Sequence, residues 1–156
     1  MGAAPGSGSL TRALACAIAA ALAPAGVGRA QLQTEVRVEA VATGPRRLEA
    51  GIGASARASP YLRAGVSGAR EVWGRGNGSS LWRSEGMVRF TMDPLAEQRW
   101  GAALGAGLGY RGRAYLLAFA ELEGPKASGM RPALQLALGG GVRLGILLRR
   151  AADGRR

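Results

Sequence analysis

Apolar and polar residues alternate along most of the chain. In residues 35–42, EVRVEAVA, Val36 and Val38 alternate with Glu35, Arg37 and Glu39. A period of two places successive side chains on opposite faces of an extended strand, whereas a helical face needs a period near 3.6. This segment therefore predicts a strand with one apolar face and one charged face.

The same alternation recurs in seven further stretches of the chain. They are residues 47–58, 61–73, 81–92, 99–112, 114–123, 130–139 and 142–150. In the second of these stretches the pattern slips near Arg70, which indicates a bulge or the end of a strand. Residues 114–123 are apolar in both alternating sets until Glu121 and Glu123. The sequence leaves the facing of that stretch open.

Short segments of turn-forming residues separate the eight stretches, such as GPKASG at 124–129 and GGG at 139–141. Connections this short join antiparallel neighbours, because a parallel pair needs a crossover of a dozen or more residues. Such a meander either leaves two unpaired edges or closes into a barrel. We therefore predict an all-β fold, an eight-stranded antiparallel up-and-down barrel over residues 31–150.

The alternating pattern fits a soluble barrel with an apolar interior and also a membrane barrel with an apolar exterior. Trp100 and Tyr110 share one face, and ten tilted residues at ~3.4 Å each place them about 26 Å apart. That separation matches the height of the apolar band between the aromatic girdles of a membrane barrel. We therefore expect a transmembrane barrel, and a soluble exported barrel or sandwich is the alternative.

The polar face supplies the candidate functional residues, because charges of both signs can pair inside a closed lumen. The predicted lumenal charge network comprises Glu35, Arg37, Glu39, Arg47, Glu49, Arg57, Arg63, Arg83, Glu85, Arg89, Glu121 and Arg143. The predicted aromatic girdle on the apolar face comprises Trp82, Phe90, Trp100 and Tyr110.

Small residues dominate the polar face of residues 99–112, where glycines occupy positions 101, 105, 107 and 109. A lumen filled with long charged side chains needs bare wall elsewhere. We expect these glycines to leave volume for Arg83, Glu85 and Arg89, which reach in from the neighbouring strand.

The start of the chain has the layout of a secretory signal. Arg12 precedes a run of mostly small apolar residues at 13–23, and small residues precede Gln31. The run is shorter than the ~20 residues that a membrane-spanning helix needs. We predict a signal peptide at residues 1–30, cleaved after Ala30, and a buried N-terminal helix is the alternative.

Composition excludes several classes of function. The chain contains no histidine, which removes Ser–His and Cys–His catalysis and histidine metal sites. Its formal charge is +11, but arginine is spread along the chain and alternates with glutamate, unlike a nucleic-acid-binding stripe. We expect no enzymatic activity, cofactor, metal or nucleic-acid partner.

Basic residues cluster only near the end of the chain, at Arg149, Arg150, Arg155 and Arg156. We interpret this cluster as a solvated end, and residues 151–156 as a short basic tail. The segment GLGYRG at 107–112 matches a dinucleotide-binding pattern. It lies between two predicted strands rather than between a strand and a helix, so we discount it.

The signal-like start, the eight predicted strands and the dyad repeat resemble the small outer-membrane β-barrels of Gram-negative bacteria, the class of OmpX and the OmpA barrel. The resemblance covers residues 31 to about 150. It implies an outer-membrane location and contact with outer-membrane lipid and the assembly machinery. It also implies a structural or anchoring role without catalysis.

One feature departs from that class, whose members usually finish on a strand with a terminal aromatic residue. The last predicted strand here ends GILLRR. The departure implies a divergent assembly signal.

Two other functions fit the sequence. The first is a soluble periplasmic barrel that binds a small apolar ligand. The second is a narrow anion-preferring pore, suggested by the surplus of arginine over glutamate on the polar face.

Overall fold

The computed structural model describes residues 32–42, 47–74, 82–93 and 99–151. No helix in this part of the chain is long and apolar enough to cross a membrane. The predicted signal peptide and residues 152–156 of the predicted tail lie outside the described residues. The strands are β1 (Leu32–Val41), β2 (Arg47–Arg57), β3 (Leu62–Gly74), β4 (Arg83–Thr91), β5 (Gly101–Tyr110), β6 (Ala114–Glu123), β7 (Met130–Leu138) and β8 (Val142–Ala151).

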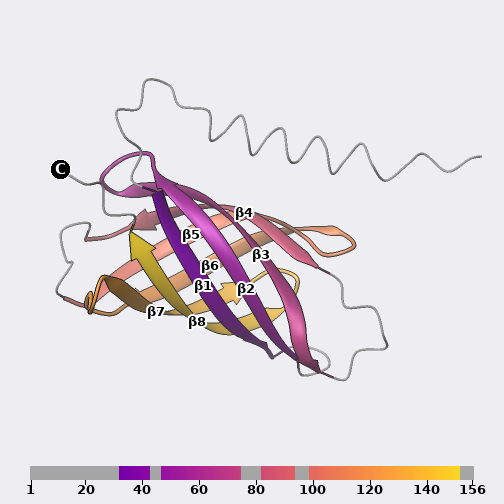
Figure 1. Cartoon of the computed structure of the whole chain (residues 1–156). Helices are drawn as coiled ribbons and strands as arrows, with labels where there is room; N and C mark the ends of the chain where they lie inside the picture. Colours follow the sequence, from indigo (N-terminus) through magenta and orange to yellow (C-terminus); the bar gives the residue numbers. More distant parts are fainter. Residues whose placement is uncertain (1–31, 43–46, 75–81, 94–98, 152–156) are drawn as a thin grey trace, which may run out of the picture.

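The eight strands form one closed barrel (Figure 1). Each strand pairs antiparallel with its neighbours in sequence, and β1 also pairs with β8. Val36 of β1, for example, lies opposite both Ile52 of β2 and Leu148 of β8. The predicted all-β fold with eight antiparallel strands closed into a barrel is therefore confirmed.

Glycine makes the turn from β7 to β8 possible. Gly139, Gly140 and Gly141 have φ angles of 123°, 64° and 128°. Side chains disfavour this region of backbone space, whereas glycine enters it freely. A Cβ atom at Gly139 would also overlap the carbonyl group of Leu116. Three glycines therefore reverse the chain within three residues and bring β7 and β8 together as neighbours.

Side chains alternate between the interior and the exterior of the barrel along each strand. In β6, Leu117, Phe119 and Glu121 face inward and are buried, whereas Leu116 faces outward and is 77% exposed. The structure thus settles the facing that the sequence left open.

A bulge interrupts the pairing of β2 with β3. Leu48 lies opposite Trp73, but Glu49 lies opposite Glu71, so Val72 is an extra residue in β3. The bulge lies just beyond Arg70, where the sequence pattern slips. Arg70 itself keeps its place on the outward face, opposite Ala50.

The interior of the barrel has only a small apolar cluster among the described residues. Leu117, Phe119 and Ala137 form it, and Met87 and Tyr115 pack against it. Most other buried side chains are charged or polar. Hydrogen bonds around the closed sheet and polar contacts in the lumen therefore supply much of the stabilisation that an apolar core supplies in a soluble protein.

Candidate functional site: a charged lumen inside an apolar belt

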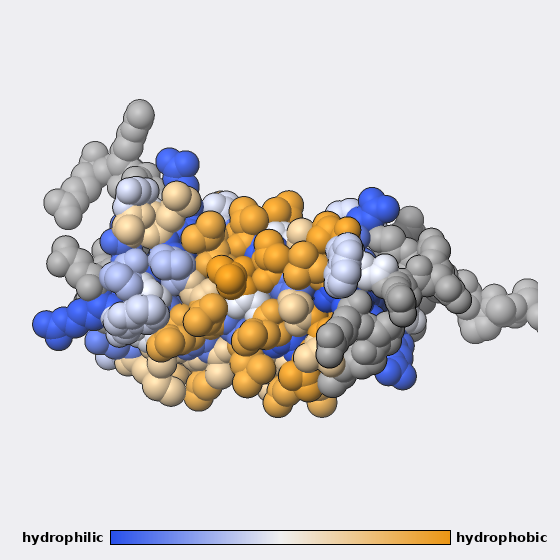
Figure 2. All heavy atoms as spheres, turned by 90° about the horizontal axis from the view of Figure 1, so that it is seen from below, coloured by the Kyte–Doolittle hydropathy of each residue, from blue (hydrophilic) through white to orange (hydrophobic). Residues whose placement is uncertain are grey.

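The outward face of the barrel is apolar. Leucine, isoleucine and valine side chains are exposed on outward positions of every strand. Figure 2 shows them as a band across the middle of the face in view, with hydrophilic residues toward both ends. Soluble monomers rarely expose a contiguous apolar patch of more than a few hundred Å². A belt of this kind is typical of a surface that faces lipid.

The four residues of the predicted aromatic girdle lie at strand ends and point outward. Trp82 precedes β4, and Tyr110 ends the neighbouring strand β5, at one end of the barrel. Phe90 lies near the end of β4, and Trp100 precedes β5, at the opposite end. Their exposed fractions range from 41% to 65%. The two pairs therefore flank the apolar belt from both sides.

Two further aromatic residues join these pairs, and the sequence analysis did not select them. Tyr61 stacks on Phe90 with ring centroids 5.9 Å apart. Trp73 lies near the end of β3 and is exposed on the same side of the belt as Trp82. Tyr61 and Trp73 are the first and last residues of the stretch 61–73. An aromatic residue at the edge of an alternating segment was the sequence signal for a girdle position.

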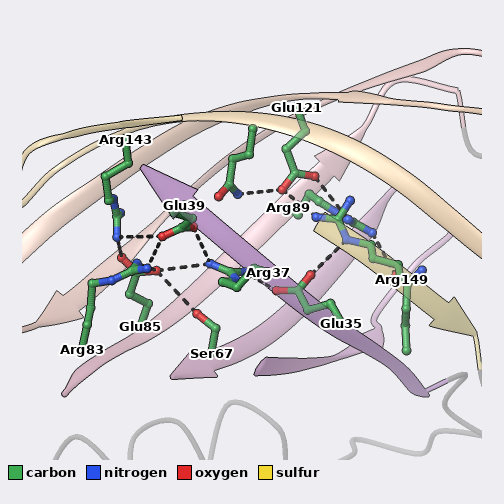
Figure 3. Close-up of polar contacts among 12 residues, drawn as sticks. Glu35, Arg37, Glu39, Ser67, Arg83, Glu85, Arg89, Glu121, Arg143 and Arg149 are labelled. Carbon is green, nitrogen blue, oxygen red and sulfur yellow. Dashed lines mark hydrogen bonds and ion pairs between the residues drawn. The ribbon is translucent and has the colours of Figure 1, made fainter. Parts of the chain in front are cut away.

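The charged residues of the predicted lumenal network all occupy inward-facing positions. The buried members are Arg37, Glu39, Glu49, Arg83, Glu85, Arg89, Glu121 and Arg143. The half-buried members are Glu35, Arg47, Arg57 and Arg63. Figure 3 shows many of them pointing toward one another across the lumen.

Glu85 of β4 is the most connected carboxylate of the lumen. It forms ion pairs with Arg83 at 2.6 Å, with Arg143 of β8 at 2.7 Å and with Arg37 of β1 at 3.5 Å. The hydroxyl of Tyr115 on β6 donates a hydrogen bond to it at 2.8 Å. Ser67 of β3 donates a further hydrogen bond at 3.5 Å, so side chains from five strands meet at one carboxylate, which ties opposite walls of the barrel together.

Arg83 extends this cluster toward the end of the barrel at which β1 and β5 finish. It pairs with Glu39, and its Nε donates a hydrogen bond to Glu49 at 2.8 Å. Glu49 also pairs with Arg47 at 3.0 Å and with Arg111. Each buried charge here has more than one counter-charge, which offsets the large desolvation cost of burying an isolated ion.

A second cluster occupies the other end of the lumen, around Arg149 of β8. Arg149 donates hydrogen bonds to Glu121 at 2.7 Å, to Glu35 at 3.0 Å and to Glu123 at 3.1 Å. Arg89 of β4 pairs with the same two β6 carboxylates, at 3.3 Å and 3.2 Å. Arg149 therefore links β8 to both β1 and β6.

Arg37 connects the two clusters. Its guanidinium pairs with Glu35 on one side, and with Glu39 at 3.3 Å and Glu85 on the other. The lumenal contacts therefore form one continuous network along the barrel axis (Figure 3).

The interpretation of Arg149 as part of a solvated basic end is wrong. Strand β8 continues to Ala151, and the alternation that buries Arg143 also directs Arg149 inward, where it is 2% exposed. Its neighbour Arg150 lies on the outward face and is exposed. The number of arginines near the end of the chain suggested a solvated cluster, although the alternation of β8 already placed Arg149 on the same face as Arg143.

Besides Arg149, the network has further members that the predicted set of lumenal charges did not include. They are Gln33, Ser67, Glu71, Arg111, Tyr115, Glu123, Arg131 and Gln135. All except Arg111 share the alternating parity of the inward residues on their strands, which was the available signal. Arg111 lies in the turn after β5 and reaches the network through its long side chain.

The glycines of β5 make room for a different neighbour from the one expected. A Cβ atom at Gly105 would overlap the ring of Phe119, and one at Gly109 would overlap the ring of Tyr115. Both rings belong to β6, which pairs with β5 on the side away from β4. The bare wall therefore accommodates aromatic rings of β6, and the expected arginines and glutamate of β4 do not fill it.

The lumen combines ion-paired carboxylates with a surplus of arginine. Its carboxylates accept from guanidinium groups. Among the described residues, no group of three or more acidic, histidine or cysteine side chains is placed to hold a metal ion. The arrangement can hold strands together, and it presents a polar, positively biased interior to any solute that enters.

Comparisons with known proteins show the fold. No protein-family model matches the chain, and no curated protein matches it in sequence. Its structure is similar to a designed transmembrane β-barrel, with a TM-score of 0.63 and 17% identity over 81% of this chain and 98% of the other. A second design, TMB2.3, gives a TM-score of 0.61 and 19% identity over 81% and 97%.

A natural protein shares this architecture. The N-terminal β-barrel domain of OprF from Pseudomonas aeruginosa matches with a TM-score of 0.59 and 9% identity, over 79% of this chain and 99% of that domain. At these identities the likeness concerns the fold alone. The chain is a closed eight-stranded antiparallel barrel whose structural neighbours include transmembrane barrels.

Proposed function

We propose that the chain is an outer-membrane β-barrel protein with a structural or anchoring role, a lumen filled by paired side chains and no catalytic activity. The observation that carries this proposal is the distribution of side chains, with charges inside and leucine, isoleucine and valine outside. In water such a protein would leave its apolar surface hydrated, which is unfavourable. A lipid environment removes that penalty, while ion pairing reduces the cost of the buried charges.

The outer membrane is the favoured compartment because closed β-barrels are characteristic of it, whereas helices cross other membranes. The signal peptide predicted at residues 1–30 supports export. Contact with outer-membrane lipid and with the assembly machinery remains a prediction of the resemblance.

The soluble periplasmic barrel requires the apolar face to turn inward and enclose a ligand. The structure turns that face outward, and the described interior is mostly charged. This arrangement argues against a soluble binding protein.

The test is folding with and without a membrane. The chain from Gln31 onward is refolded into lipid vesicles and, separately, into detergent-free buffer, and each sample is run unheated and heated on a gel. We expect heat-modifiable migration, typical of a compact barrel, only from vesicles. A monomer that folds in buffer would overturn the proposal.

A narrow anion-preferring pore is a second candidate, favoured by the surplus of positive charge in the lumen. The inward arginines are Arg37, Arg47, Arg57, Arg63, Arg83, Arg89, Arg111, Arg131, Arg143 and Arg149, against the inward glutamates Glu35, Glu39, Glu49, Glu71, Glu85, Glu121 and Glu123. Planar-bilayer recordings with a salt gradient test it. A reversal potential shifted toward that of the anion supports the pore, and the absence of conductance removes it.

A further inference from the structure

Positive charge accumulates at the end of the lumen where β2 turns into β3. The inward arginines at this end are Arg57, Arg63, Arg89, Arg131 and Arg149, and the inward glutamates are Glu35, Glu121 and Glu123. Among the inward-facing described residues at this end, five arginines therefore face three glutamates.

Several of these arginines lie directly opposite one another on paired strands. Arg63 of β3 lies opposite Arg57 of β2 and opposite Arg89 of β4. Like charges directly opposite on neighbouring strands destabilise a sheet. Arg63 therefore lies between two like charges.

Arg63 differs from these neighbours. Arg89 pairs with both carboxylates of β6, but no carboxylate oxygen of the described residues lies within 4.0 Å of the Arg63 guanidinium. The Nη1 atom of Arg63 is buried and has no hydrogen-bond partner in that part of the chain. Buried charged donors without an acceptor are rare, and a bound water or ion is a usual explanation.

A small cavity adjoins this side chain. Its volume is about 10 Å³, and Arg63, Arg89, Arg149, Ser55 and Glu35 are among the residues that line it. A space of this size holds one particle close to a water molecule in size. Ala54, Gly65, Val66 and Met87 complete the lining, so its charged groups are three arginines and Glu35, which accepts from Arg149 and Arg37. A small anion suits such a lining better than a neutral water molecule does.

We propose that this cavity binds a single monoatomic anion of the chloride class, with Arg63 as its principal ligand. The ion neutralises the Arg63 guanidinium and stabilises the barrel as a fixed counter-ion. This inference goes beyond the proposed function, because it depends only on the lumen and holds whether or not the barrel conducts.

The first test compares anions. The full chain is folded in an uncharged detergent, and urea unfolding is followed by tryptophan fluorescence in sodium chloride and in sodium gluconate at equal ionic strength. Gluconate is too large for the cavity. Because a ligand of the native state stabilises it by mass action, we expect a higher urea midpoint in chloride, with an increase that saturates.

Two variants make the comparison specific. Arg63→Gln removes the proposed ligand, so the difference between chloride and gluconate should disappear. Arg150→Gln removes the same charge from the outward face of β8 and should retain the full difference. Equal midpoints in the two salts for the unmodified chain, or an unchanged difference in Arg63→Gln, would overturn the proposal.

A second measurement needs no variant. Crystals of the unmodified chain grown in bromide should show an anomalous scattering peak in the cavity beside Arg63. Peaks confined to surface arginines would indicate an adventitious ion only, and a water molecule refined in the cavity would have the same meaning. Either outcome rejects the site.

Discussion

Glu85 offers the most direct test of the lumenal network. Substituting Glu85→Gln keeps the shape of the side chain and removes its charge. Arg83, Arg143 and Arg37 then lose a shared counter-ion, while an amide oxygen remains to accept the hydrogen bond from Tyr115. No cavity forms, so any loss of stability is electrostatic.

The magnitude follows from the burial of the cluster. Breaking a buried ion pair by removing one partner costs about 3–5 kcal/mol. Here Glu39 remains paired with Arg83 and lies 3.8 Å from Arg143, so part of the charge stays compensated. We therefore expect the free energy of unfolding of Glu85→Gln to fall by about 3 kcal/mol, at the lower end of that range.

The assay is a reversible urea titration of the chain refolded into vesicles, followed by tryptophan fluorescence. Glu71→Gln is the matched control, because Glu71 is only half-buried and has Arg111 at 3.5 Å as its ion-pair partner. Exposed or weak pairs contribute about 0–1 kcal/mol. If Glu85→Gln destabilised the barrel no more than Glu71→Gln does, the argument that buried pairing holds the lumen together would be refuted.

Three more predictions concern the wall of the barrel. Leu136→Arg, in the middle of the outward belt, should destabilise the inserted barrel by about 2–4 kcal/mol, whereas Ser84→Arg near the edge of the belt should destabilise it by about 0–1 kcal/mol. Both are measured by urea titration in vesicles, and equal effects would contradict a lipid-facing belt. Gly105→Ala should lose about 1–3 kcal/mol through overlap with Phe119. Gly68→Ala, whose added Cβ would meet nothing nearer than 3.8 Å, should lose little in the same titration. Lipids brominated near the headgroup should quench tryptophan fluorescence more than lipids brominated at the chain end. The reverse order would contradict the placement of the aromatic girdle at the membrane interface.

The strands and their two faces could be predicted from the alternation alone. Glu35, Arg37 and Glu39 repeat with a strict period of two, so all three lie on the same face of a closed sheet. Which face turns inward needed a further argument, since the period is the same in soluble and membrane barrels. The spacing of Trp100 from Tyr110 supplied it.

The facing of β6 could not be predicted, because its two alternating sets are both apolar over most of its length. In the observed facing, Phe119 and Tyr115 fit against Gly105 and Gly109 of β5. Large residues opposite glycines are visible only when the register of the two strands is known. The sequence shows the aromatic residues of β6 and the glycines of β5, but it does not show which of them lie opposite one another.

The ion-pair partners in the lumen also could not be predicted from the sequence. Arg149 and Glu35 are 114 positions apart in the chain and meet only because the sheet closes. Alternation predicts that both point inward, but which guanidinium reaches which carboxylate depends on strand stagger and side-chain length.

That same contact bears on the order of assembly. Arg149 belongs to the last strand and Glu35 to the first, so they join across the seam where β8 meets β1. Until β1 and β8 pair, Glu35 lacks its contact with Arg149 and keeps only its ion pair with Arg37. Closure of the sheet and formation of this ion pair therefore occur in the same step, and a chain that ends before β8 would have neither.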